Sequence, residues 1–207
     1  MSRKPFRRAG DAERRADLIE AMLDCIAEGG IQNATVREVA ERAGVSGGLI
    51  RHYFETKEHL LHAAYHATME EMMALGNEAI AACPPKARLK AFVVACLTPP
   101  MIDPRRLSLW AAFIAMAHAD PAMGKIHRET YGAYRILIEN VIAEAFSEAG
   151  RVAPQAVVRR LAIEVNAVLD GLWLEGSLAG DMFDDGELLQ AGLHAVEAIT
   201  GFTLEGE

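Results

Sequence analysis

Residues 35–54 of the chain read TVREVAERAGVSGGLIRHYF, and their pattern indicates two short helices with a turn between them. Thr35 followed by Glu38 has the form of a capping box, which predicts a short helix over residues 36–43. A Gly-Val-Ser turn interrupts that helix, and its last residue, Ser46, can cap the helix that follows. Two short helices joined by a three-residue turn containing glycine form a helix-turn-helix, in which the outer face of the second helix projects from the protein.

A projecting helix of this kind fits the major groove of B-DNA. Two glycines near its start would let the backbone approach DNA closely. Arg51 can read guanine or bind phosphate, and the His and Tyr that follow it can donate to phosphate oxygens. The candidates from spacing alone are Thr35, Gly47, Gly48, Arg51, His52, Tyr53 and Lys57. The first and last of these lie at helix N-termini, where backbone N–H groups favour phosphate. An ordinary helical hairpin with a glycine turn is the alternative interpretation.

The remainder of the chain predicts further helices. Aromatic residues make up only 6%, prolines number 8, and much of the 51% hydrophobic content is alanine, which is typical of packed helices. Asp11 is a candidate N-cap for the first helix, which Gly29 and Gly30 should end. The predicted helices cover residues 12–28, 36–43, the segment after Ser46, 57–82, 86–97, 104–119, 121–149, 154–179 and 186–200. We therefore expect an all-α fold of nine helices.

Charge is unevenly distributed along the chain. Residues 1–60 hold 10 Lys and Arg against 10 Asp and Glu, whereas residues 61–207 hold 11 against 19 and account for the whole net charge of −8. A basic run, Arg3, Lys4, Arg7 and Arg8, precedes any acidic residue. A basic arm ahead of a neutral domain can hold DNA even in an acidic protein. A solvated tail is the simpler interpretation on charge alone.

Several classes of protein are not expected from this sequence. No apolar stretch approaches the roughly 20 residues of a membrane span, and no apolar run follows the charged start as it would in a signal peptide. Cys25, Cys83 and Cys96 lack Cys-x-x-Cys spacing, which indicates buried thiols in a cytoplasmic protein. The common phosphate-binding and hydrolase motifs are missing, so we expect no enzyme. A helical interaction protein that makes no use of its helix-turn-helix is the alternative class.

Residues 35–54, with the Lys-Glu-His-Leu-Leu sequence shortly after them, closely resemble the DNA-binding segment of the TetR family of repressors, and the resemblance covers roughly residues 12–62. It implies a homodimer that binds a palindromic operator, with a helix-turn-helix domain in residues 1–55 and a ligand-binding and dimerisation domain in residues 56–207. Carried over by position, the DNA contacts are Thr35, Ser46, Gly47, Gly48, Arg51, His52, Tyr53 and Lys57. Most family members have Tyr in place of Arg51, so the operator sequence is not transferable.

Two tryptophan-containing segments resemble the choline-sensing BetI branch of that family more narrowly. They are Asp-Gly-Leu-Trp-Leu-Glu-Gly-Ser-Leu-Ala-Gly around Trp173 and Leu-Ser-Leu-Trp-Ala-Ala-Phe around Trp110. Trp110 and Phe113 share a helix face, and Asp170 and Trp173 have the same i,i+3 spacing. Aromatic faces and a carboxylate hold small organic cations, so these four side chains form the candidate ligand site. Core packing is the commoner role of such aromatic residues, and a neutral amphiphilic or aromatic ligand is the alternative to a cation.

Three histidines, His59, His62 and His66, lie at i, i+3 and i+7 on the helix predicted over residues 57–82, with Glu70 one turn further on. Such spacing can bind a metal ion or line a pocket. A polar helix face is the commoner meaning of the pattern, and we therefore predict neither a metal nor a cofactor.

The last two long helices, about residues 155–179 and 186–200, have amphipathic patterns. Their apolar residues include Leu161, Val165, Val168, Leu172, Leu188, Leu189, Leu193 and Val196. Two such helices from each subunit would bury these residues in a four-helix interface. A dimer also places two recognition helices about 34–36 Å apart, which suits the half-sites of a palindrome. We expect a bound ligand to act on the long helix over residues 57–82 and so release DNA.

Overall fold

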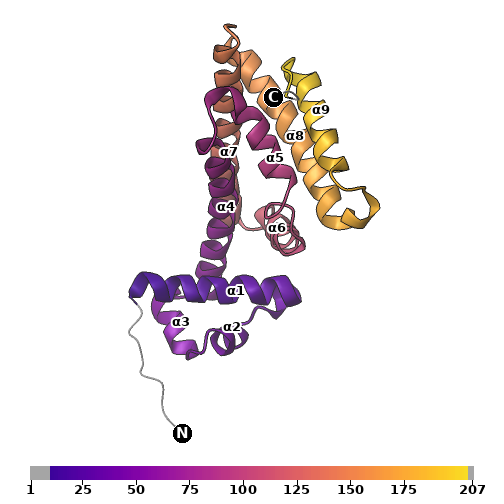
Figure 1. The fold of residues 1–207 in the computed structure, drawn as a ribbon. Helices are drawn as coiled ribbons and strands as arrows, with labels where there is room; N and C mark the ends of the chain where they lie inside the picture. Colours follow the sequence, from indigo (N-terminus) through magenta and orange to yellow (C-terminus); the bar gives the residue numbers. More distant parts are fainter. Residues whose placement is uncertain (1–9, 205–207) are drawn as a thin grey trace. The chain divides into compact units, whose positions relative to one another are not determined.

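The computed structural model describes residues 10–204, and every regular element in that range is helical (Figure 1). Nine α-helices and two short 3-10 helices follow one another in this range: α1 (Asp11–Asn33), α2 (Val36–Arg42), α3 (Gly47–Phe54), α4 (Lys57–Ala81), η1 (Pro85–Ala87), α5 (Arg88–Leu97), α6 (Pro104–Ala117), α7 (Pro121–Glu148), α8 (Gln155–Ala179), η2 (Gly180–Met182) and α9 (Glu187–Thr200). The prediction of an all-α fold of nine helices is confirmed. The basic run Arg3, Lys4, Arg7 and Arg8 lies outside the described residues.

Side-chain caps fix the starts of the two short helices in the helix-turn-helix. The backbone N–H of Glu38 donates to Thr35 Oγ1 at 3.2 Å, and that of Leu49 donates to Ser46 Oγ at 3.3 Å. Each bond satisfies a backbone donor that a helix start otherwise leaves without a partner. Both caps are those that the sequence predicts.

The two ends of α1 differ from the sequence prediction. Gly10 rather than Asp11 is the N-cap, and Asp11 instead accepts a hydrogen bond from the Tyr53 hydroxyl at 3.0 Å. The prediction that Asp11 is the N-cap is wrong. An aspartate is favourable within the first turn as well as at the cap, because its carboxylate meets the positive end of the helix dipole there. The expected stop at Gly30 is a break inside the helix. This glycine has a φ of 73°, in the left-handed region, and helical turns resume as far as Asn33.

The chain forms two compact units, Met1–Ala67 and Thr68–Glu207. The division falls within α4, which is one continuous helix from Lys57 to Ala81. The domain bounds expected from the sequence, 1–55 and 56–207, place the division at the start of the same helix and stay a prediction. Because α4 crosses the division, it belongs to both units.

In the N-terminal unit, α1, α2 and α3 share one hydrophobic core. Leu18 and Met22 of α1, Val39 of α2, and Ile50 and Phe54 of α3 are almost completely buried. Burial of such side chains is the main favourable contribution to the folding of a small unit. Because Ile50 and Phe54 anchor one side of α3, the opposite side of this helix is left to solvent.

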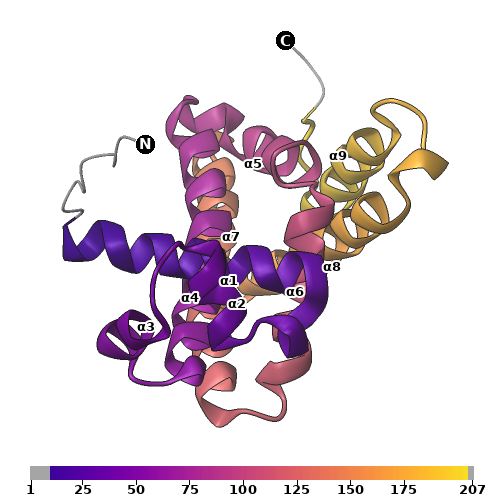
Figure 2. The same ribbon diagram turned by 90° about the horizontal axis from the view of Figure 1, so that it is seen from below.

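The core of the C-terminal unit is built mainly from α5, α7, α8 and α9. Phe92 of α5, Ile138 and Ile142 of α7, Val165 of α8 and Val196 of α9 are fully buried there. The helices α8 and α9 lie side by side in both ribbon views (Figures 1 and 2).

Four residues expected at a dimer interface are part of this core instead. Leu161, Val165, Leu193 and Val196 are at most 5% exposed and pack within the chain. The prediction that they contact a partner subunit is wrong. Helical spacing shows that a helix has an apolar face, but it does not show whether that face packs inside the chain or against another chain.

Candidate functional site

The solvent-facing side of α3 carries several of the residues expected to contact DNA. Ser46, Gly48, Arg51 and His52 are exposed. Arg51 makes no side-chain hydrogen bond or ion pair with the residues that the structure describes, so its N–H donors are available to another molecule. The other candidates are Thr35, which is exposed at the start of α2, and Gly47, Tyr53 and Lys57, which are half-buried.

Tyr53 and Lys57 also hold the N-terminal unit together. The Tyr53 hydroxyl donates to Asp11 at 3.0 Å, and this hydrogen bond raises the pKa of Tyr53. Lys57 Nζ donates to the Ile31 carbonyl at 3.4 Å, and the Arg15 guanidinium donates to the Tyr53 carbonyl at 2.6 Å. These contacts join α1 to the end of α3 and the start of α4. Tyr53 and Lys57 therefore have structural partners within the chain.

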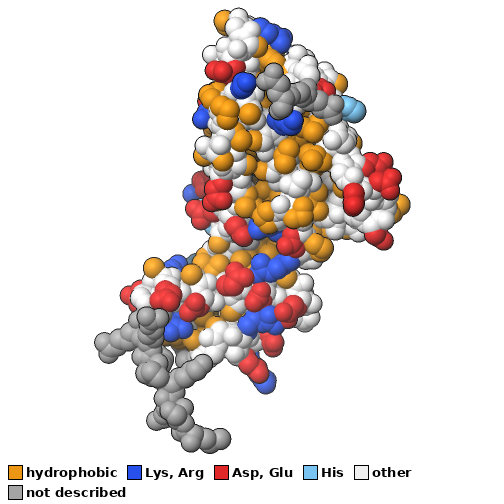
Figure 3. All heavy atoms as spheres, viewed as in Figure 1, with side chains coloured by type: hydrophobic (Ala, Val, Ile, Leu, Met, Phe, Trp, Pro, Cys, Tyr) orange, Lys and Arg blue, Asp and Glu red, His pale blue; other side chains and the backbone are white. Residues whose placement is uncertain are grey.

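The two units differ in how charge is arranged on their surfaces. On the face shown in Figure 3, basic and acidic side chains are interspersed over the N-terminal unit. Acidic side chains gather instead at the turn between α8 and α9, where Asp181, Asp184 and Asp185 are exposed (Figure 3). The net charge of the protein is negative, so the protein as a whole does not attract DNA. Any attraction has to come from basic side chains and hydrogen-bond donors gathered on one part of its surface.

The C-terminal unit contains a cavity of about 230 Å³ with walls from α4, α5, α6, α7 and α8. The walls are mostly apolar and rich in sulfur and aromatic rings. They include Met69, Met72 and Met73 of α4, the aromatic side chains of Trp110, Tyr131, Tyr134 and Trp173, and the carboxylate of Asp170. Apolar walls with a few convergent polar groups are the usual form of a small-molecule site.

Trp173, Tyr131 and Tyr134 have their polar atoms paired within the protein. The rings of Trp110 and Trp173 meet edge to face, with centroids 5.6 Å apart and an interplanar angle of 77°. The Trp173 indole N–H donates to the Met101 carbonyl at 2.9 Å, which fixes the ring. Cys96 Sγ lies 3.2 Å from the Tyr134 hydroxyl, and burial raises the pKa of Cys96 to about 12, so it stays a neutral thiol. The rings are left to offer mainly their faces to a ligand.

Asp170 provides the carboxylate of the cavity wall. The Tyr131 hydroxyl and the Asn166 amide both donate to Asp170 Oδ2, the amide at 2.9 Å. Burial raises the pKa of Asp170, while these two hydrogen bonds and the positive charge of Arg135 oppose the rise. Burial also raises the pKa of Tyr131 to about 12, so this hydroxyl stays protonated and able to donate. A carboxylate in such apolar surroundings favours a positively charged neighbour.

Three of the four residues expected in the ligand site, Trp110, Asp170 and Trp173, line the cavity. Phe113 is fully buried and is not among the lining residues. Sequence reasoning missed the walls supplied by other helices, which include Met69, Met72, Met73, Tyr131 and Tyr134. The two tyrosines have the same i,i+3 spacing that singled out Trp110 and Phe113, so that signal was present. Nothing in the sequence shows that their faces meet across the cavity.

The histidines of α4 do not form a metal site with other described residues. His59 Nδ1 lies 3.1 Å from the Phe54 carbonyl and 3.7 Å from the Glu55 carboxylate. Among residues 10–204, no three His, Cys, Asp or Glu side chains gather as they would around a metal ion. In the same range, no helix combines the length and apolar character that crossing a membrane requires.

Both units of the chain match models of known protein families. Residues 18–64 match the family described as bacterial regulatory proteins of the tetR family, and residues 85–201 match the C-terminal domain of BetI-type transcriptional repressors. The HTH-type transcriptional regulator BetI of Paraburkholderia phymatum is 36% identical over 174 residues, which are 83% of this chain and 85% of that protein. BetI of Burkholderia thailandensis is 37% identical with the same coverage.

Solved structures share the fold over almost the whole chain. A protein from Pseudomonas aeruginosa PAO1 described as a transcriptional regulator matches with a TM-score of 0.83 and 35% identity, covering 94% of this chain and 93% of that chain. A transcriptional regulator from Saccharomonospora viridis, solved in complex with choline, matches with a TM-score of 0.70 and 20% identity, covering 92% and 95%. At 20% identity the likeness concerns the fold alone.

Proposed function

The chain belongs to the TetR family of transcriptional regulators, with a BetI-type C-terminal domain, and from this premise we propose that it represses transcription at a palindromic operator until a small organic cation enters its cavity. It is a DNA-binding regulator rather than an enzyme. Regulators of this family usually act as dimers that respond to small-molecule effectors. Because its target is DNA, we expect the protein to work in the cytoplasm.

The proposed DNA-binding surface is the exposed side of α3 together with the starts of α2 and α4. Its residues are Thr35, Ser46, Gly47, Gly48, Arg51, His52, Tyr53 and Lys57. The exposure of Arg51 and His52 supports a role in contacting bases or phosphates. The first backbone N–H groups of a helix have no acceptor within the helix and suit phosphate, which supports the positions at the starts of α2, α3 and α4.

The proposed dimer interface involves α8 and α9, with residues different from those first expected. Three large apolar side chains of α8 stay exposed on the single chain: Ile163 at 43%, Leu174 at 37% and Leu178 at 68%. Spacings of 11 and 4 residues place these three on one face of the helix. An exposed apolar stripe on a long helix is a common feature of an interface between subunits. Its burial would bring two copies of α8 together.

The observation that carries the cation proposal is the placement of Asp170 among aromatic rings. Quaternary ammonium groups bind to aromatic faces, and a carboxylate within the same apolar cavity adds a charge that the ligand can neutralise. Trp110, Trp173, Tyr131 and Tyr134 supply the rings. The Saccharomonospora viridis regulator, which shares this fold, was solved in complex with choline. We therefore propose choline or a closely related cation as the effector.

The proposed function is tested by titrating choline into a complex of the protein with DNA. The DNA is a palindromic duplex selected from a random library by the wild-type protein, and fluorescence anisotropy reports its binding. We expect choline to release the duplex and to raise the melting temperature, since a ligand at 100 times its Kd stabilises a protein by about 2.7 kcal/mol. The matched control is 3,3-dimethylbutan-1-ol, which has the shape of choline without its charge. A similar response to both compounds would contradict a charge-selective site.

A neutral amphiphilic or aromatic effector is the second candidate. Met69, Met72 and Met73 favour it, because methionine side chains adapt to ligands of irregular apolar shape. A thermal-shift screen separates the two candidates. Stabilisation by neutral amphiphiles, without any by choline-like cations, would support this second candidate. The proposed role as a repressor would then stand, with a neutral effector in place of the cation.

A further inference from the structure

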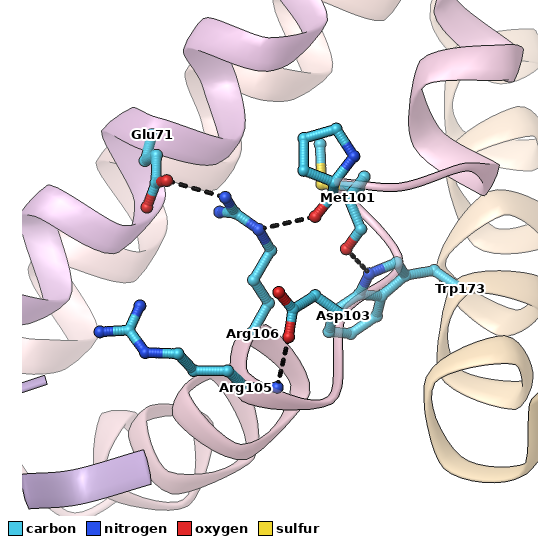
Figure 4. Close-up of polar contacts among 7 residues, drawn as sticks. Glu71, Met101, Asp103, Arg105, Arg106 and Trp173 are labelled. Carbon is cyan, nitrogen blue, oxygen red and sulfur yellow. Dashed lines mark hydrogen bonds and ion pairs between the residues drawn. The ribbon is translucent and has the colours of Figure 1, made fainter. Parts of the chain in front are cut away.

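The segment that joins α5 to α6 is held at two consecutive backbone carbonyls (Figure 4). The Trp173 indole N–H donates to the Met101 carbonyl at 2.9 Å. Arg106 Nε donates to the Pro100 carbonyl, also at 2.9 Å. The far end of the segment is fixed to α6, because the N–H of Arg105 donates to Asp103 Oδ1 at 2.7 Å. A displacement at one of these carbonyls therefore passes directly to the other.

Arg106 also reaches α4 from this position. Its Nη2 donates to Glu71 Oε1 at 2.7 Å, so one guanidinium bonds both the segment and the helix (Figure 4). The Arg106 side chain is only 11% exposed, whereas that of Glu71 is 56% exposed. A planar guanidinium can hold two partners in fixed directions, which a lysine ammonium does not do as well. The geometry makes Arg106 the connection between the Pro100 carbonyl and α4.

The opposite end of this series of contacts lies in the ligand cavity. Trp173 and Met101 both line the cavity, and Trp173 also meets Trp110 there. A ligand held by the tryptophan faces has to contact the ring whose N–H holds the Met101 carbonyl. The contacts run from the cavity through Trp173, the Pro100–Met101 backbone and Arg106 to Glu71 of α4, without a gap.

We propose that Arg106 is a positioning residue that couples occupancy of the cavity to α4. This inference rests on the proposed function, because it assumes that a ligand in this cavity controls DNA binding. The Arg106–Glu71 pair holds α4 to the segment. A ligand that moves the Trp173 ring shifts the Pro100 carbonyl and loosens that hold. Because α4 is one helix from Lys57 to Ala81, the change reaches residues of the N-terminal unit along the helix itself.

A second ion pair in the same unit provides a matched control. Arg88 Nη1 donates to Glu144 at 2.6 Å and Arg88 Nε donates to the Cys83 carbonyl at 3.3 Å, so this arginine also bonds one carboxylate and one backbone carbonyl. None of these three residues lines the cavity. Removing the charge of a partly exposed carboxylate changes folding stability little, so Glu71→Gln and Glu144→Gln are both expected to stay folded.

The experiment measures three quantities for wild type, Glu71→Gln, Arg106→Lys and Glu144→Gln. Calorimetry gives the Kd for choline, and anisotropy gives the Kd for the selected duplex without choline and with saturating choline. The ratio of the two DNA constants is the coupling, which is typically 5-fold to 150-fold in ligand-controlled proteins. We expect Glu71→Gln and Arg106→Lys to lower this ratio about 3-fold to 5-fold, which is the upper range for a partly exposed ion pair, with the Kd for choline changed less than about 2-fold. Glu144→Gln should keep the wild-type ratio.

The double variant Glu71→Gln/Arg106→Lys should lower the ratio no further than the stronger single variant, because both changes break the same connection. A wild-type ratio in Glu71→Gln would overturn the inference and leave the proposed function intact. Loss of choline binding itself in Glu71→Gln would also overturn it, since the pair would then belong to the binding site. A wild-type protein that binds no choline would overturn the proposed function and this inference together.

Discussion

The N-terminal unit and the cavity of the C-terminal unit differ in how far apart their functional residues lie in the sequence. The proposed DNA contacts all fall between Thr35 and Lys57, on α2, α3 and the start of α4, which follow one another in the sequence. The cavity walls run from Met69 to Leu174 and come from five helices. Local spacing is therefore enough to predict the proposed DNA-binding surface, whereas the set of residues around the cavity depends on packing between helices that are distant in sequence.

The substitution Phe113→Ala tests the limits of local spacing and has the largest expected effect. The sequence places Phe113 beside Trp110 on one helix face, yet its side chain is fully buried. Because truncation leaves a hole in a packed region, we expect the free energy of unfolding to fall by about 3–5 kcal/mol. Denaturant unfolding measures the change. Unchanged stability combined with weaker choline binding would show that Phe113 belongs to the ligand site after all.

How much of the molecule the sequence predicts depends on the range of the interactions involved. The caps at Thr35 and Ser46 act over three residues, so they were predicted and are present. Asp170 was placed in the ligand site from its spacing to Trp173, but its partner Tyr131 lies 39 residues away on α7. No pattern of period 3.6 specifies such a pairing, because helical spacing describes one helix and not how two helices cross.

Asp170→Asn sharpens the comparison at the ligand site by removing charge without changing shape. We expect choline binding to weaken by about 1.5–3 kcal/mol, which is roughly 10-fold to 150-fold, because the cation loses an ionised partner. Calorimetry with choline gives the loss. The affinity for 3,3-dimethylbutan-1-ol, which carries no charge, should hardly change. Equal losses for the two compounds would mean that the carboxylate acts only by supporting the cavity wall.

Arg51→Ala tests the proposed DNA-binding surface of α3, again by removing one charged group. Losing a base or phosphate contact should weaken binding to the selected duplex by about 1–3 kcal/mol, while the dimer stays intact. Anisotropy and size-exclusion chromatography measure the two properties. Lys125→Ala, on an exposed part of α7, is the control and should bind DNA like wild type. If Arg51→Ala also binds like wild type, α3 is not the helix that reads the operator.

The pH dependence of choline binding follows from the raised pKa of Asp170. The ionised carboxylate attracts the cation. The affinity for choline is therefore highest at pH values well above this pKa and falls as the pH drops through it. Burial raises the pKa, so the fall begins at a higher pH than for an ordinary aspartate with a pKa near 3.9. Below the pKa, each pH unit costs up to about 1.4 kcal/mol of binding free energy, until the total loss equals that of Asp170→Asn. Calorimetry at several pH values should give this profile in wild type and a flat one in Asp170→Asn. A flat wild-type profile down to about pH 4 would contradict it.

Substitution of Ser46 has the smallest expected effect on the free energy of unfolding. It distinguishes a residue that only caps a helix from one that also contacts DNA. Its hydroxyl caps α3, so Ser46→Ala should lower the free energy of unfolding by about 1 kcal/mol. Ser46→Asp keeps a capping oxygen but adds a negative charge at the proposed DNA surface. If Ser46 only caps the helix, the aspartate variant binds the duplex as well as wild type. If Ser46 also lies against phosphate, the aspartate variant is stable and binds DNA more weakly than the alanine variant, because like charges repel. Unfolding curves and anisotropy on the same two variants decide between these outcomes.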